Sequence, residues 1–122
     1  MTEAVRRGAV WLLRDGQVLA TTEVAASLAA RTRGLLGHSS YEGALLLEHT
    51  RSVHTIGMRF ALDVAFLDRD LVVRDMLYMA PWRMAMPRRR CRKVLEAQAG
   101  AFERWGLRKG DRLELRYAGD GS

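Results

Sequence analysis

The sequence has little cysteine and no long apolar run. Cys91 is the only cysteine among 122 residues, so an intrachain disulfide is impossible and a cysteine-based zinc site is excluded. The N-terminal stretch has two arginines and then a short apolar run before Arg14, whereas a membrane span needs about 20 apolar residues. These absences predict a cytoplasmic protein with neither a signal peptide nor a transmembrane segment.

Histidine is also scarce, and no histidine has a metal-binding spacing. His38 follows a glycine, and His49 and His54 are five residues apart, which in an extended segment puts the two rings on opposite faces. Because no HExxH or paired-histidine motif exists, we expect no metal site and no cofactor. His54 is a candidate for acid–base chemistry, and an ordinary hydrogen-bonded histidine is the alternative.

Lysine is nearly absent, so arginine supplies most of the positive charge. The chain has a net charge of +6, and this charge is unevenly distributed. Residues 83–93 contain six of the 20 basic residues and no acid, which leaves 14 basic against 14 acidic residues elsewhere. Such a segment could bind phosphate, nucleic acid or another anion, since guanidinium groups match phosphate oxygens. A solvated loop in an arginine-rich chain is the alternative. The predicted ligand-binding residues are Arg33, Arg59, Trp82, Arg88, Arg89 and Arg90.

Short apolar runs separated by turn residues predict a mainly β (α+β) fold in a single domain over residues 1–122. Asp15 and Gly16 between apolar runs indicate a hairpin, and further strands are expected over 43–48, 62–67, 71–79, 92–97 and 111–117. Thr22 before an Ala- and Leu-rich segment predicts a helix over 23–31, and residues 100–106 predict a second. About seven short strands with two short helices favour a compact β-barrel or sandwich.

Two carboxylates are candidates for catalysis, together with His54. Asp63 lies in a strand whose faces both look apolar, so its charge needs a partner. It could be a general base, or a structural residue that accepts N–H bonds from the 54–60 loop or pairs with Arg33 or Arg59. Glu96 shares strand parity with Val94, and beside Asp63 it would form an acid–base pair. A salt bridge to an arginine is the alternative for Glu96.

Two further groups of side chains have competing interpretations. The arginines around Cys91 would favour its thiolate and make it a nucleophile, although an incidental thiol is the simpler interpretation. Four methionines in the sequence neighbourhood of Trp82 are predicted to pack in the core or the loops; these are Met76, Met79, Met84 and Met86.

Several motifs in order resemble the family called domain of unknown function 192 (DUF192), found in bacteria and archaea. They are residues 33–36 (RGLL), 54–68 (HTIGMRFALDVAFLD), 94–100 (VLEAQAG) and 110–111 (GD), and the likeness covers residues 17–116. The resemblance implies a compact, mostly β fold and no particular activity. This chain departs from many relatives at Gly57, where they have an aromatic residue, and at Ala61, where they have proline.

These observations leave three functions open. The favoured one is a small binding domain whose basic segment docks an anionic ligand or nucleic acid, with no membrane partner. The alternative is a small hydrolase- or isomerase-like enzyme that uses Asp63, His54 and Glu96. In the third, the motif residues are purely architectural and the chain acts through a protein partner. The sequence leaves the oligomeric state open.

Overall fold

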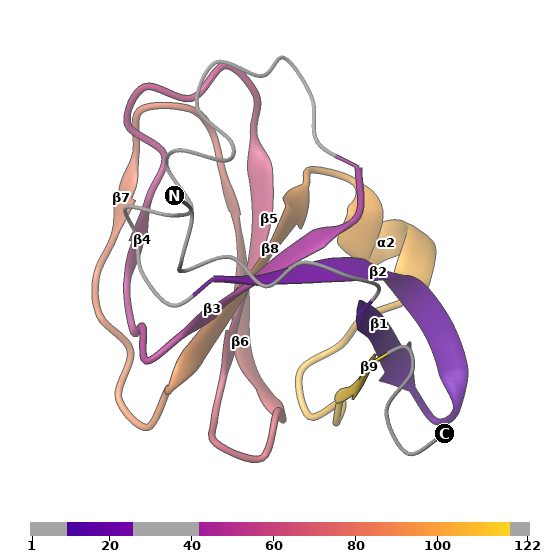
Figure 1. Ribbon diagram of the computed structural model, residues 1–122. Coiled ribbons are helices and arrows are strands. Elements are labelled where there is room, and N and C mark those ends of the chain that lie inside the picture. Colours follow the sequence, from indigo (N-terminus) through magenta and orange to yellow (C-terminus); the bar gives the residue numbers. More distant parts are fainter. Residues whose placement is uncertain (1–9, 26–41, 118–122) are drawn as a thin grey trace.

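The computed structural model describes residues 10–25 and 42–117, which are organised around one seven-stranded sheet (Figure 1). The order of its strands is β6-β5-β8-β3-β2-β1-β9, and every neighbouring pair is antiparallel except β2 and β3. The strands are β1 (Val10–Arg14), β2 (Gln17–Ala25), β3 (Ala44–Glu48), β5 (Leu62–Leu67), β6 (Val73–Met79), β8 (Lys93–Gln98) and β9 (Glu114–Tyr117). Two short strands, β4 (Val53–His54) and β7 (Met84–Ala85), form a separate antiparallel pair.

The hairpin expected at Asp15 and Gly16 is confirmed, and a second one joins β5 to β6. Asp15 and Gly16 have φ of 53° and 79° in the turn between β1 and β2, as a two-residue hairpin turn requires. Asp68 begins the turn into β6, where its carboxylate accepts the N–H of Asp70 at 2.9 Å and that of Val72 at 3.1 Å. The β fold therefore rests on turns that the sequence specifies locally.

The prediction of a helix over 23–31 is wrong for its first residues, and residues 26–31 lie outside the described part of the chain. Residues 22–25 end strand β2 and pair in parallel with residues 44–47 of β3. Val24 and Ala25 are buried there, so pairing with a distant central strand outweighs the local helix preference. In the described ranges the one helix is α2 (Ala101–Trp105), which confirms the expected turn of helix over 100–106. No helix of those ranges is long and apolar enough to cross a membrane.

The sheet does not close into a barrel, so the barrel alternative is wrong, and a sandwich-like arrangement fits better. Its two edge strands, β6 and β9, approach each other at a single bridge between Val72 and Arg112. Beside this bridge, the N–H of Val73 donates to the carbonyl of Asp111 and the N–H of Leu113 donates to that of Leu71. The remaining length of β6 stays an edge of the sheet.

Each face of the sheet carries its own apolar cluster. Leu62, Val64 and Phe66 of β5 face one cluster, which the segment around β4 and β7 covers. Ala65 and Leu67 face the other, which contains α2 and residues of β1 and β9. This alternation confirms the period-two pattern predicted for residues 62–67. In Figure 1 β4 and β7 lie on the left of the view, and α2 and the sheet strands β1 and β9 lie on the right.

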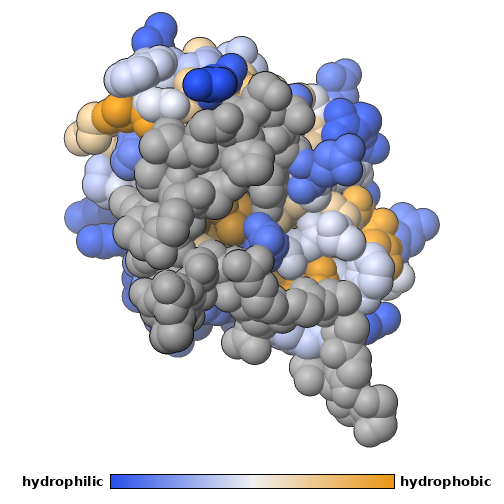
Figure 2. Space-filling view, turned by 45° about the horizontal axis from the view of Figure 1, so that its top comes forward, coloured by the Kyte–Doolittle hydropathy of each residue, from blue (hydrophilic) through white to orange (hydrophobic). Residues whose placement is uncertain are grey.

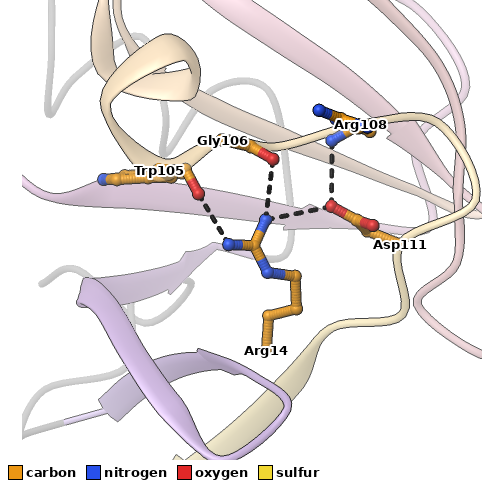
Figure 3. A network of polar contacts seen from close by, with 5 residues as sticks. All are labelled: Arg14, Trp105, Gly106, Arg108 and Asp111. Carbon is orange, nitrogen blue, oxygen red and sulfur yellow. Dashed lines mark hydrogen bonds and ion pairs between the residues drawn. The ribbon is translucent and has the colours of Figure 1, made fainter.

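Arg14 at the end of β1 ties this strand to the C-terminal part of the chain (Figure 3). Its guanidinium donates to the carbonyl of Trp105 at 2.7 Å and to that of Gly106 at 3.0 Å. It also pairs with Asp111 at 3.0 Å, and the same carboxylate oxygen accepts the N–H of Arg108 at 2.9 Å. One half-buried side chain thus holds the end of α2 and the 106–111 turn against the hairpin.

Candidate functional site

Thr55 fixes a tight turn that presents Trp82 to solvent. The Thr55 hydroxyl donates to the carbonyl of Ala80 at 2.6 Å and accepts the N–H of Arg83 at 2.9 Å. Its backbone accepts the N–H of Trp82 at 2.9 Å and donates to the carbonyl of Arg83 at 2.8 Å. Thr55 itself is fully buried. Trp82 is 63% exposed and has φ of 64°, a conformation that costs energy in a residue other than glycine.

Large apolar side chains are exposed around this turn. Tyr78, Met84 and Met86 are 63%, 75% and 75% exposed. The sequence predicts that the methionines pack in the core or the loops, and Met84 and Met86 instead leave most of their surface open to solvent. The prediction is confirmed for Met79, which is buried, and for Met76, which packs on the core. Figure 2 shows apolar side chains at the surface on the upper left, the side on which β4 and β7 lie in Figure 1. Exposed methionine and aromatic side chains are typical of binding surfaces.

A groove of about 490 Å³, here called the β7 groove, lies between β6 and the segment that contains β7. Leu77, Tyr78, Met79 and Ala80 form one wall, and Arg83, Met84, Ala85, Met86 and Arg88 form the other. The groove is therefore lined mainly by apolar side chains, together with two arginines.

A second hollow of about 530 Å³, here called the α2 groove, also borders β6. Met76, Phe102 and Glu103 line it together with Asp63, and Leu77 and Tyr78 line both hollows. The β7 groove includes Met79, which belongs to the Phe66 cluster, and the α2 groove includes Phe102, which belongs to the Leu67 cluster. The two hollows thus open on opposite faces of the edge strand.

In the basic segment 83–93 some of the basic side chains form ion pairs with described residues and others do not. Arg83, Arg89, Arg90 and Arg92 are exposed, and across residues 10–25 and 42–117 none of these four forms an ion pair. Of the residues predicted to bind a ligand, Arg59 is also exposed, and Arg33 lies outside the described residues.

Arg88 is held by contacts within the protein. Its Nε lies 2.9 Å from Asp75 Oδ2, its Nη1 donates to the carbonyl of Met86 at 2.9 Å, and its guanidinium stacks on the Phe66 ring at 4.7 Å. This arrangement assigns Arg88 a structural role. Lys93 is likewise paired with Glu48 at 3.7 Å.

The Arg88 pair makes stability depend on acid pH. The Arg88 guanidinium holds the pKa of Asp75 below its ordinary value of 3.8, against partial burial that raises it, and the N–H of Met76 and the charge of Lys109 also lower it. A depressed folded-state pKa contributes stability above the unfolded pKa, and this contribution is lost as pH falls through the folded pKa. We expect Asp75→Asn to reduce the free energy of unfolding at pH 7 by at most about 1 kcal/mol.

Urea denaturation of both proteins at pH 7 and at about pH 2 checks this prediction, because the difference should shrink once Asp75 is protonated. Asp70→Asn, at an exposed aspartate in the same hairpin, should change little at either pH. An equal loss at both pH values would contradict the assignment.

Asp63 has a structural partner, although not one of those expected. Its Oδ2 accepts the N–H of Gly100 at 2.9 Å and that of Phe102 at 3.1 Å. The carboxylate therefore caps the first turn of α2. The structural alternative expected the N–H donors in the 54–60 loop. The donors are instead Gly100 and Phe102, which lie 37 and 39 residues after Asp63 in the chain.

The three catalytic candidates are not brought together. Asp63 lies opposite Ala97 and Val64 lies opposite Glu96, so Asp63 and Glu96 project from opposite faces of the sheet. Glu96 is only 1% exposed, as its strand parity predicted. His54 lies outside this sheet in β4, opposite Met84, and its Nδ1 accepts the N–H of Ile56 at 3.3 Å. This geometry does not favour an acid–base pair of Asp63 and Glu96.

The surroundings of Cys91 do not favour its role as a nucleophile. Cys91 is 1% exposed, and burial raises the pKa of its thiol, while the nearby charge of Arg88 lowers it less. The reactive thiolate is therefore disfavoured. Residues 10–25 and 42–117 contain no group of three or more histidine, cysteine, aspartate or glutamate side chains that could hold a metal ion.

Comparisons with known proteins identify relatives of unknown activity. The sequence model of DUF192, described as "Uncharacterized ACR", matches residues 10–115. A UPF0127 protein of Pyrococcus furiosus is 40% identical over 63 residues, which are 52% of this chain and 54% of that protein. A UPF0127 protein of Pyrococcus horikoshii is 33% identical over 63 residues, 52% of this chain and 55% of that protein. The chain thus spans about half the length of the curated relatives that it matches.

Two crystal structures resemble the fold over most of its length. A Sinorhizobium meliloti protein, described as a proposed transcription regulator, aligns over 92% of this chain and 95% of its own, with a TM-score of 0.74 and 27% identity. A protein of unknown function from Novosphingobium aromaticivorans aligns over 87% of this chain and 83% of its own, with a TM-score of 0.69 and 20% identity. The second likeness shows the fold alone.

Proposed function

Because this chain belongs to DUF192, an uncharacterised family, we propose a function from its own surface: it is a small binding domain for an anionic partner. The observation that carries the proposal is the set of exposed arginines in segment 83–93, namely Arg83, Arg89, Arg90 and Arg92, which follows the exposed Trp82 in the chain. Unpaired guanidinium groups attract anions and bind their oxygens bidentately.

The rigidity of the surface supports this proposal. Hydrogen bonds between Thr55 and residues 80–83 hold the turn that carries Trp82 and Arg83, so little conformational freedom is lost there on binding. The contacts of Arg88 with Asp75 and Phe66 anchor the next part of the segment. The description of the Sinorhizobium meliloti protein as a proposed transcription regulator is compatible with a binding role.

The test is a fluorescence-anisotropy titration with two labelled polyanions, oligodeoxythymidylate and polyglutamate, at several salt concentrations. We expect at least one to bind with an affinity that falls as salt rises. The double variant Arg89→Gln with Arg92→Gln should weaken binding about tenfold. It should also make the affinity depend less steeply on salt concentration, since each lost contact between an arginine and an anionic group removes part of that dependence.

The matched control is Arg104→Gln with Arg108→Gln, which removes the same charge from two exposed arginines on the α2 side. This control should weaken binding much less. Binding of neither polyanion at low salt, or an equal effect of the two double variants, would overturn the proposal.

A further inference from the structure

We infer that the outer edge of β6 takes up an extended acidic peptide as an added strand, whose alternate side chains occupy the β7 groove and the α2 groove. This inference rests on the proposed function, because it names the chemical class of the anionic partner.

The first step is the free edge of β6. Within residues 10–25 and 42–117, β6 pairs as a strand only with β5. At its start, Val73 exchanges backbone hydrogen bonds with Gly110 and Asp111. Farther along, Leu77 and Tyr78 border both grooves, and no backbone bond joins the outer edge of this part to another described segment. An open sheet edge is a template for another strand.

The second step is the position of the two grooves. Successive side chains of an added strand point to opposite faces of the sheet, and each face of β6 has a hollow beside it. Their volumes, about 490 and 530 Å³, suffice for more than one side chain each. A peptide on this edge would therefore bury side chains on both faces while its backbone continues the sheet.

The third step is the difference in charge between the grooves. Arg83 lines the β7 groove beside Met84 and Met86, and the exposed arginines 89, 90 and 92 follow in the same segment. The α2 groove has Met76 and Phe102 with two acidic residues, Asp63 and Glu103, at its wall. An acidic side chain that enters the first groove would meet Arg83, and an apolar side chain that enters the second would meet Met76 and Phe102.

The fourth step is the comparison with nucleic acid. Single strands bind along basic grooves in which successive bases stack on aromatic rings. Here methionine forms much of the apolar wall, and a nucleotide backbone has no alternating N–H and C=O groups to match a sheet edge. The described surface therefore favours a peptide with acidic and apolar residues in alternation.

The experiment uses a fluorescein-labelled synthetic peptide in which Glu and Val alternate, titrated against the full chain. We expect saturable binding by this peptide. Two matched peptides, one with Lys in place of Glu and one with a central proline, should bind at least about tenfold more weakly. The first has the wrong charge, and the proline lacks an N–H for the ladder.

Matched protein variants locate the site. Met84→Glu adds a negative charge to the β7 groove, and we expect it to weaken binding of the Glu–Val peptide about tenfold. Val18→Glu places the same charge at a 55% exposed position on β2 and should leave the affinity unchanged. Thermal melting of both variants verifies that they fold.

The outcomes separate this inference from the proposed function. Failure of the Glu–Val peptide to bind, with salt-dependent binding of oligodeoxythymidylate that Arg89 and Arg92 support, would overturn the inference and leave the proposed function standing. Equal binding of the proline peptide, or no effect of Met84→Glu, would overturn strand addition at this edge. If the protein dimerises and Met84→Glu abolishes the dimer, the partner at this edge is a second copy of the chain, and the peptide inference is overturned. If neither the peptide nor the polyanions bind, both proposals fail.

Discussion

Replacing Arg14 by methionine is expected to lower the free energy of unfolding by about 2–4 kcal/mol. The substitution keeps an apolar stem of similar length but removes the donors to the carbonyls of Trp105 and Gly106 and to the carboxylate of Asp111. Hydrogen bonds from charged donors contribute more than neutral ones, and these groups are only partly open to water. Urea denaturation of the variant and the parent protein measures the difference.

The matched control for this prediction is Arg116→Met. Arg116 pairs with Glu114 at 3.4 Å, and the two side chains are 58% and 55% exposed, so its loss should cost less than about 1 kcal/mol. If both variants lost the same stability, the network in Figure 3 would have no special role. Arg14→Lys should fall between the parent and Arg14→Met, because an ammonium lacks the planar fork that spans several acceptors.

The second large effect is expected for Thr55→Val, which should cost about 2–3 kcal/mol. Valine keeps the β-branched shape of threonine but leaves the carbonyl of Ala80 and the N–H of Arg83 without their hydroxyl partner in a buried position. Because these bonds close the turn that carries Trp82, cleavage by trypsin after Arg83 should also become faster. The two measurements are urea denaturation and the rate of limited proteolysis.

Thr21→Val is the appropriate control, since Thr21 is exposed on strand β2. It should change the free energy of unfolding by less than about 0.5 kcal/mol and leave the rate of cleavage after Arg83 unchanged. An unchanged proteolysis rate in Thr55→Val would show that the left-handed backbone of Trp82 is held without the hydroxyl.

Local patterns predicted the parts of the fold that depend on local chemistry. The turn at Asp15 and Gly16 and the alternation along residues 62–67 follow from turn preferences and from the two-residue period of a strand. The helix prediction over 23–31 fails at Val24 and Ala25, because their conformation is set by parallel pairing with β3 about 20 residues away. No local signal encodes that pairing.

The candidate site was predictable in composition but not in geometry. The basic segment is visible in the sequence, as is the requirement that Asp63 must have a partner. The identity of that partner depends on the return of β8 alongside β5. The exposure of Met84 and Met86 also could not be predicted. These residues lie between Pro81 and Pro87, and tertiary contacts decide whether an apolar side chain in such a loop packs inward or outward. In this protein Thr55 and Arg88 hold the backbone on either side of Met84, at Arg83 and at Met86.

The order of strands also constrains how the chain reaches its folded state. Val10 of β1 is paired with Tyr117 of β9, and β8 lies between β3 and β5 in the centre of the sheet. Most of the sheet therefore cannot assemble until residues far along the chain have been synthesised, and its pairings close long loops. Folding should accordingly be slow for a domain of this size, on the order of milliseconds to seconds. During that time the partly formed sheet has open edges on strands that the folded protein covers.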